Sequence, residues 1–213
     1  MTLIYHITHI DNLPGILREG GLWCDAEALK RGLLVQSIAY PELKERRSRR
    51  NVETLDGRPV AAGGSLADYV PFYFANRSPM LYAIHTGYVE GYTGGQAEVV
   101  YLVSSVEHVV TMGGQWCFTD GHAVEALTEF FFSLDDLSRL DWSVVEHWTW
   151  RDRANDLDRK RRKQAEFLVH RFFPWEWVQS VAVMTSPMAT RVREMIAGLG
   201  HQPVVTLERK WYY

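Results

Sequence analysis

The sequence predicts an α+β fold, in which short strands and amphipathic helices follow one another without an internal repeat. Residues 3–8 mix apolar, aromatic and β-branched side chains, as strands do, and lead directly into a helical pattern over residues 13–17. Residues 98–103 are almost continuously apolar, which is typical of a central strand. Residues 187–199 space their apolar side chains as an amphipathic helix does.

Composition limits the classes of protein to consider. A chain of 213 residues fits one domain over residues 1–213, and 46% hydrophobic residues suffice for a full core. The net charge of −3 is no global signature of nucleic-acid binding, so such a role would need a local basic patch. Two cysteines indicate neither a disulfide framework nor a zinc site. Without a signal-peptide pattern or a long apolar run, we expect a cytoplasmic protein that does not enter membranes.

The first strand carries polar groups where a plain core strand would stay apolar. His6 and Thr8 are two residues apart, so both side chains should lie on one face, while Ile7 points into the core. Asp11 or Asn12 can cap the following helix, and the two glycines at 20–21 end it. A lone histidine is more often structural than functional, so this stretch needs support from elsewhere in the chain.

The next segments alternate between basic and aromatic character. Residues 41–50 have helical composition and carry four arginines. From charge alone, this cluster could be no more than a solvated basic face of the helix. Residues 51–67 predict a loop, residues 68–74 predict an aromatic strand that includes Tyr73, and residues 80–84 predict an apolar helical turn.

The second half predicts further elements and a second basic block. The pattern from Ser104 to Glu107 is typical of a capping box at a helix start. A short strand ends at residue 118, and Thr119 or Asp120 could cap a helix after it. Residues 159–163 are five consecutive cations, which lead into a strand at residues 167–169 with Glu166 at its entrance. Strands at residues 178–184 and 203–207 flank the helix at 187–199.

The His-x-Thr pattern with this glutamate resembles the ADP-ribosyltransferases. More closely, residues 4–17, 37–49, 69–82, 118–122 and 163–169 resemble the DarT family, DNA ADP-ribosyltransferase toxins of bacterial toxin–antitoxin pairs. The loop at 51–67 and the segment at 141–160 match poorly. The resemblance implies a split central sheet with flanking helices and NAD as a substrate, without a metal. It also implies thymidine in single-stranded DNA as the acceptor and a DarG-like macrodomain antitoxin as a partner, and we expect a monomer.

The resemblance also implies the roles of individual residues. Glu166 would stabilise the cationic ribose formed when the N-glycosidic bond of NAD breaks, and Arg47 would take part in catalysis. The residues expected to bind NAD are His6, Ile7, Thr8, Asn12, Gly15, Trp23, Arg47 and Tyr73. The residues expected to contact DNA are His122, Trp116 and Arg153. Apart from the resemblance, the tryptophans and the basic block within residues 116–163 suit base stacking and phosphate neutralisation, so these residues would form the DNA-binding surface, with an affinity that falls steeply with salt.

Other interpretations remain open at this point. The same fold could modify guanosine, RNA or protein. RNA 2′-phosphotransferases also use a His-Thr strand and NAD, but they lack the Gln164-x-Glu166 pattern. The chain could also be a non-catalytic nucleic-acid-binding module that uses its basic blocks, although the presence of Glu166 and Arg47 argues against this. No G-x-G-x-x-G pattern is present, so a Rossmann turn does not hold NAD.

Overall fold

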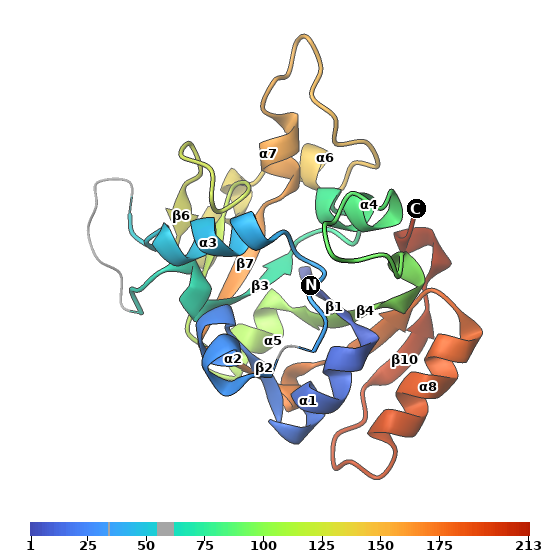
Figure 1. The fold of residues 1–213 in the computed structure, drawn as a ribbon. Coiled ribbons are helices and arrows are strands. Elements are labelled where there is room, and N and C mark those ends of the chain that lie inside the picture. The colour runs from blue at the N-terminus through green and yellow to red at the C-terminus, as the bar shows by residue number, and fades with distance from the viewer. Residues whose placement is uncertain (34, 55–61) are drawn as a thin grey trace.

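An eight-stranded sheet runs through the centre of the molecule (Figure 1). The computed structural model describes residues 1–33, 35–54 and 62–213. Neighbouring strands are antiparallel except β9 and β10, which are parallel. In spatial order the strands are β10 (Val204–Leu207), β9 (Ser180–Val183), β4 (Val99–Ser105), β1 (Leu3–His9), β3 (Tyr69–Tyr73), β7 (Glu166–His170), β5 (Trp116–Thr119) and β6 (Phe130–Phe131).

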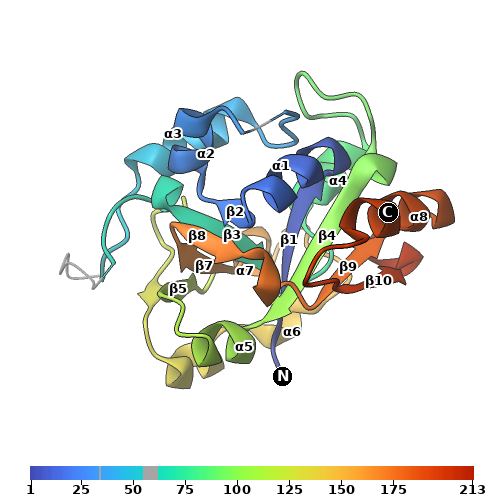
Figure 2. The same ribbon diagram turned by 90° about the horizontal axis from the view of Figure 1, so that it is seen from below.

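Helices and a small second sheet cover this central sheet. In Figure 2 the sheet lies between α1 to α4 on one side and α5 and α6 on the other, with α8 beside β10 at one end. The second sheet pairs β2 (Gly21–Trp23) with β8 (Phe172–Pro174). The α-helices are α1 (Leu13–Arg18), α2 (Asp25–Arg31), α3 (Pro41–Arg49), α4 (Pro79–His85), α5 (Val106–Thr111), α6 (Trp142–Val145), α7 (Arg159–Lys163) and α8 (Ser186–Ile196).

Strand β4 is buried on both faces, which explains its continuous apolar sequence. Val100 and Leu102 belong to the core that contains residues of α5 and α8. Tyr101 and Val103 point the other way, into the core that contains residues of α4. The strand therefore supplies both hydrophobic layers, and the predicted central strand is confirmed.

The sheet is nearly divided between β1 and β3. These two strands share a single register pair, Tyr5 with Tyr73, whereas β1 pairs with β4 along seven residues. Beyond that pair the side chain of His6 reaches across, and its Nδ1 lies 2.8 Å from the carbonyl oxygen of Pro71. The split in the sheet, which the resemblance implied, therefore lies beside the His-x-Thr stretch.

The predicted strands are confirmed, as are the helices predicted at 13–17, 41–50, 80–84 and 187–199, but the helix expected after residue 119 and several predicted helix caps are wrong. Asn12 precedes α1 without capping it, since its amide binds the backbone of residues 35 and 36 instead. Ser105, rather than Ser104, caps α5, and the Glu107 carboxylate accepts from the Thr2 backbone. No helix follows Thr119 within the described residues 120–133, and its hydroxyl binds the Gly121 carbonyl. The loop predicted at 51–67 lies partly outside the described residues.

The Asn12 side chain gives the first testable prediction. Its amide makes four hydrogen bonds of 2.8–3.2 Å, to Thr8 Oγ1, to the Gln36 carbonyl and from the amides of Val35 and Gln36. Asn12→Ala leaves these buried groups unpaired, so we expect a loss of about 2 kcal/mol in unfolding free energy, or about 4–8 °C in Tm. Calorimetric melting measures this.

Asn76→Ala is the matched control, because the half-buried side chain of Asn76 makes no hydrogen bond with the described residues. Equal Tm values for the two variants would show that the Asn12 amide does not stabilise the fold.

Candidate active site

A cavity opens where β1 and β3 diverge. The residues around it come from β1, α1, β2, α2, α3, β3 and β7, so it lies where the second sheet and the first three helices meet the central sheet. All eight residues expected to bind NAD line this cavity, as do Glu166 and His122. The predicted sites of the amino-terminal half and the predicted catalytic glutamate are thus brought together by the fold.

A buried ion pair forms the floor of the cavity. Arg47 Nη1 donates to Glu166 Oε2 at 2.8 Å, and only 7% and 3% of the two side chains are exposed. The other carboxylate oxygen, Oε1, accepts from the Ala123 amide at 2.9 Å. Thr119 Oγ1 accepts from the backbone amide of Glu166, which orients the start of β7. Because both carboxylate oxygens are held, the charge of Glu166 has a defined position.

The ion pair also sets the charge state of Arg47. Burial by itself lowers its pKa, but the adjacent Glu166 carboxylate outweighs burial, and the pKa of Arg47 is raised above the ordinary value. The guanidinium therefore remains a cation. Its Nε atom is buried without a hydrogen-bond partner among the described residues, so one donor is left over for a ligand in the cavity.

His6 has a single possible tautomer in this arrangement. The Pro71 carbonyl can only accept, so His6 Nδ1 must carry the proton, and Nε2 is an acceptor. Burial lowers the pKa of His6, so the ring stays neutral near pH 7. The imidazole can therefore accept a hydrogen bond from a hydroxyl group in the cavity.

The remaining residues expected to bind NAD form the cavity walls. The side-chain amide of Asn12 is occupied by its bonds to Thr8, Val35 and Gln36, so it shapes the wall. A Cβ atom on Gly15 would lie in van der Waals contact with the Leu33 carbonyl oxygen at 3.6 Å, so the backbone of residue 33 packs closely against this turn of α1. The Trp23 ring lies 4.0 Å from the Arg31 guanidinium, and its buried Nε1 has no partner among the described residues.

Tyr73 lies directly beside Glu166. The two residues are register partners on β3 and β7, which brings their side chains together on one face. Burial and the Glu166 charge raise the pKa of Tyr73, so its hydroxyl stays protonated. The hydroxyl has the Met80 sulfur at 3.6 Å as its neighbour.

A second cavity adjoins the first, and four residues line both: Leu43, Tyr73, Met80 and His122. His122 is held by its backbone amide, which donates to the Arg161 carbonyl at 2.9 Å, and its Nδ1 lies 3.8 Å from Glu125. Burial lowers the pKa of His122 although the Glu166 charge opposes this, so the ring is neutral near pH 7. The second cavity lies between α4 and the segment 150–164.

The other two residues expected to contact DNA do not reach either cavity. Trp116 stacks on Phe167, whose neighbour Glu166 points to the opposite face of β7, so Trp116 lies on the far side of the sheet. Arg153 is exposed on the loop that precedes α7, and its guanidinium contacts the Thr149 hydroxyl. Neither residue lines the first or the second cavity.

The basic block of α7 is largely neutralised within the protein, which changes the expectation of a basic DNA surface. Arg161 pairs with Asp158 and Asp120, and Arg162 pairs with Asp141 and Asp156. Lys163 is buried and donates to the carbonyls of residues 145 and 147, and burial lowers its pKa to about 8. Of the five cations only the Lys160 side chain has neither an ion pair nor a hydrogen bond within the described chain.

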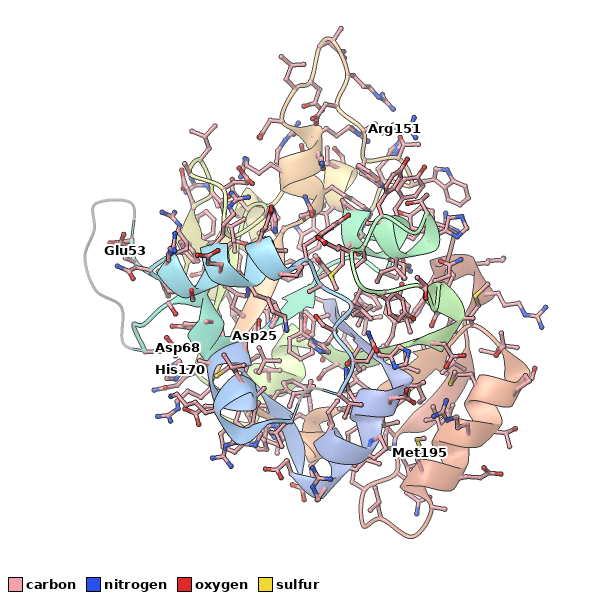
Figure 3. All side chains as sticks on the ribbon, in the orientation of Figure 1. Asp25, Glu53, Asp68, Arg151, His170 and Met195 are labelled. Atoms are coloured by element: carbon pink, nitrogen blue, oxygen red, sulfur yellow. The ribbon has the colours of Figure 1, made fainter. Side chains whose placement is uncertain are left out.

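Several residues of the site were not predicted. Asp25, labelled in Figure 3, begins α2 on the side that faces α3, and its Oδ1 lies 3.7 Å from Lys44 Nζ. Leu43, Lys44 and Met80 lie inside stretches that resemble the DarT pattern, so that pattern could have indicated them. Asp25 and Gln36 lie outside these stretches and carry no sequence signal.

The described ranges 1–33, 35–54 and 62–213 contain neither a metal centre nor a membrane-spanning helix. No group of three or more histidine, cysteine, aspartate or glutamate side chains there could hold a metal ion. No helix in the same ranges is long and apolar enough to cross a membrane.

The chain is similar to proteins of one family along its whole length. Residues 5–213 match the family described as ssDNA thymidine ADP-ribosyltransferase, DarT. A DNA ADP-ribosyl transferase of Thermus sp. (strain 2.9) is 42% identical over 214 residues, covering 100% of this chain and 96% of the relative.

Solved structures give the same result. Thermus sp. 2.9 DarT in complex with ADP-ribosylated ssDNA superposes with a TM-score of 0.91 at 41% identity, covering 100% of this chain and 96% of that chain. Its complex with NAD+ gives 0.87 at 39% identity, covering 100% and 98%. A DNA ADP-ribosyl transferase–glycohydrolase fusion protein of Thermosipho africanus is 25% identical over 91% of this chain and 45% of its own length.

The buried ion pair makes a prediction about stability. Glu166→Leu leaves the Arg47 cation buried without its partner, so we expect a loss of about 3–5 kcal/mol in unfolding free energy. The double variant Arg47→Met with Glu166→Leu should recover most of this loss, because no unpaired charge remains. Urea denaturation measures both variants.

A neighbouring exposed pair provides the control. Arg46 and Glu125 lie 3.2 Å apart with 55% and 43% of their side chains exposed, so Glu125→Leu should cost less than about 1 kcal/mol. If Glu166→Leu costs no more than Glu125→Leu, the buried pair does not organise the fold.

Proposed function

Because this chain belongs to the DarT family of single-stranded-DNA thymidine ADP-ribosyltransferases, we propose that its two joined cavities bind NAD and a thymidine of single-stranded DNA. The enzyme transfers ADP-ribose from NAD to the thymine base and releases nicotinamide. The observation that carries this proposal is the buried Arg47–Glu166 pair, which lies in the first cavity beside the wall shared with the second.

Glu166 stabilises the transition state of nicotinamide release. The bond between ribose C1′ and the nicotinamide nitrogen breaks, and its electron pair leaves with nicotinamide. Positive charge then develops on the ribose, and a carboxylate held by Arg47 and by the Ala123 amide is preorganised to meet it. The same carboxylate can accept a hydrogen bond from a ribose hydroxyl.

The acceptor nitrogen must lose a proton as the new bond forms. Thymine has one ring nitrogen that is not bonded to deoxyribose, N3, and it carries one proton. Arg47 has a raised pKa, so it does not accept this proton and instead stabilises the negative charge that develops on the base. His122 is neutral and lies on the wall shared by both cavities, so we assign the proton to its ring.

The first cavity holds NAD through groups of the amino-terminal segments. His6 Nε2 accepts a hydrogen bond from a ribose hydroxyl, and Thr8 supplies a hydroxyl on the same strand. Gly15 has no side chain, so the adenosine half can approach the backbone of α1 closely, and the Trp23 ring, whose Nε1 has no partner among the described residues, lines the same cavity. Arg47 and Tyr73 lie at the other end, beside Glu166, where the nicotinamide ribose binds.

The biological setting follows from the chemistry of the reaction. A protein that modifies thymine bases blocks the use of DNA as a template, so the enzyme acts as a toxin in the cytoplasm, where DNA and NAD are both present. The Thermosipho fusion protein joins a DNA ADP-ribosyl transferase to a DNA ADP-ribosyl glycohydrolase, which supports a DarG-like macrodomain antitoxin as partner. Residues 1–213 act as one monomeric catalytic domain, since both cavities are built from this single chain.

Glu166→Gln tests the chemical step. The variant keeps the size and most hydrogen bonds of the side chain but loses its charge, so transfer to a thymidine-containing oligonucleotide should fall by about 10²–10³-fold. Mass spectrometry of the oligonucleotide after incubation with NAD measures the product. The same assay with DNA and RNA oligomers that lack thymidine tests the choice of acceptor.

The control is Glu45→Gln on the exposed side of α3, where the carboxylate pairs with Arg49 and with no other cation among the described residues. Transfer by the Glu166 variant at the rate of the Glu45 variant would contradict the assigned role.

His6→Ala tests how NAD is held. Loss of a buried polar partner should weaken NAD binding by about 1–3 kcal/mol, while affinity for single-stranded DNA changes little because the second cavity does not include His6. Calorimetric titrations with NAD and then with DNA measure both affinities. His108→Ala, on α5 and away from both cavities, should change neither. Unchanged NAD affinity, or an equal loss for DNA, would make His6 a structural residue.

A further inference from the structure

Tyr213 packs against Tyr82, which lines the second cavity, and is held there by several contacts. Arg77 Nη2 donates to the Tyr212 carbonyl at 2.6 Å, and the Arg77 guanidinium lies 5.1 Å from the Tyr213 ring. Gln96 binds the Tyr213 backbone on both sides, since it donates to the carbonyl and accepts from the amide. Arg77 and Gln96 therefore fix the backbone of residues 212 and 213, and Arg77 also lies against the Tyr213 ring.

The Tyr213 hydroxyl connects two segments that line the second cavity. Trp150 Nε1 donates to this hydroxyl at 3.1 Å, and the hydroxyl donates in turn to the Ser78 carbonyl at 3.4 Å. Ser78 is also the N-cap of α4, because its hydroxyl accepts from the Leu81 amide. One hydroxyl group thus holds the 146–158 loop against the start of α4.

The aromatic rings on both sides of this bond form one wall of the cavity. Tyr82 and Trp150 both line the cavity, with ring centroids 5.5 Å apart at an angle of 70°, and the Tyr213 ring packs on Tyr82 at 5.1 Å. Lys160 also lines the cavity, and its Nζ lies 5.9 Å from the Trp150 ring. Arg151, labelled beyond α4 in Figure 3, reaches the Tyr82 hydroxyl at 3.5 Å.

Charge alone does not explain how this cavity binds a nucleic acid. Arg46 and Arg161, which also line it, are paired with Glu125 and Asp158. Lys160 is the one cation of the cavity lining without an ion pair among the residues described. Aromatic side chains that stack on bases can bind single-stranded DNA even where few cations contact its phosphates. The Tyr82–Trp150 wall is therefore the feature of this cavity best suited to hold a base.

We propose that Tyr82 and Trp150 form a stacking subsite for a nucleotide that flanks the target thymidine, and that Tyr213 is the positioning residue that holds this subsite in place. Lys160 neutralises the phosphate next to the stacked base. The proposal rests on the proposed function, because it assigns the second cavity to single-stranded DNA. Tyr213 itself touches no reacting atom.

A substrate series tests the subsite. Thymidine-containing oligonucleotides are prepared in which each nucleotide around the target is replaced, one at a time, by an abasic residue. For the unaltered enzyme we expect KM to rise about tenfold at one flanking position, with kcat unchanged. Trp150→Ala should raise KM for the intact oligonucleotide by a similar factor and should no longer respond to the abasic residue at that position.

Tyr213→Phe tests the positioning role, since it removes only the hydroxyl group. We expect KM for DNA to rise about threefold with kcat and NAD affinity unchanged. Trp150→Phe removes the donor of the same hydrogen bond. The double variant Trp150→Phe with Tyr213→Phe should therefore have a KM for DNA no higher than that of the more affected single variant. Tyr92→Phe is the matched control: it removes a hydroxyl that donates to the Gly95 carbonyl, outside both cavities, and should leave KM for DNA unchanged.

The outcomes separate the two levels of the proposal. If the unaltered enzyme modifies thymidine but no flanking abasic residue changes KM, the subsite is wrong and the proposed function stands. The same conclusion follows if Trp150→Ala and the abasic residue each raise KM independently, so that their factors multiply when they are combined. If the Tyr213→Phe and Trp150→Phe effects multiply, or if Tyr213→Phe behaves like Tyr92→Phe, the positioning role is wrong. If no oligonucleotide of the series is modified, the proposed function fails together with the subsite.

Discussion

The structure depends on one buried ion pair, Arg47 with Glu166. A guanidinium and a carboxylate removed from water are stable only when each is paired and hydrogen-bonded, so α3 and β7 must meet in one geometry. Ala123, in the turn after β5, adds its amide to the same carboxylate. The pair therefore connects three segments and fixes one charge where the two cavities adjoin.

A divided sheet makes room for that pair. Full pairing of β1 with β3 would close the space in which the His6 ring lies. The two strands share one register pair, Tyr5 with Tyr73, and the His6 ring bonds to the Pro71 carbonyl beyond it. The surrounding strands compensate, since β4 is buried on both faces and pairs with β1 along its whole length. The cavity is thus an interruption in a sheet that is otherwise continuous.

The cations of α7 serve mainly to hold the fold together. Four of the five cations of α7 are satisfied within the protein, either by aspartates or by backbone carbonyls. These bonds hold the 146–158 loop, and the Trp150–Tyr213 bond holds its aromatic side against α4. The second cavity therefore owes its shape largely to ion pairs, and aromatic rings form one of its walls, in a chain whose net charge is slightly negative.

Local pattern was sufficient for the main strands and helices. Alternation and helical spacing depend on neighbours within four residues, so strands such as Val99–Ser105 and helices such as Ser186–Ile196 could be predicted, and a resemblance over the chain indicated His6, Arg47 and Glu166. Only the tertiary structure decided which polar groups meet. Arg47 and Glu166 are 119 residues apart, Trp150 and Tyr213 are 63 apart, and Asn12 bonds to residue 36 in preference to capping its own helix. Such pairs are selected by the packing of whole elements, because a buried polar group takes whichever partner the fold brings within reach, and no local periodicity encodes that choice.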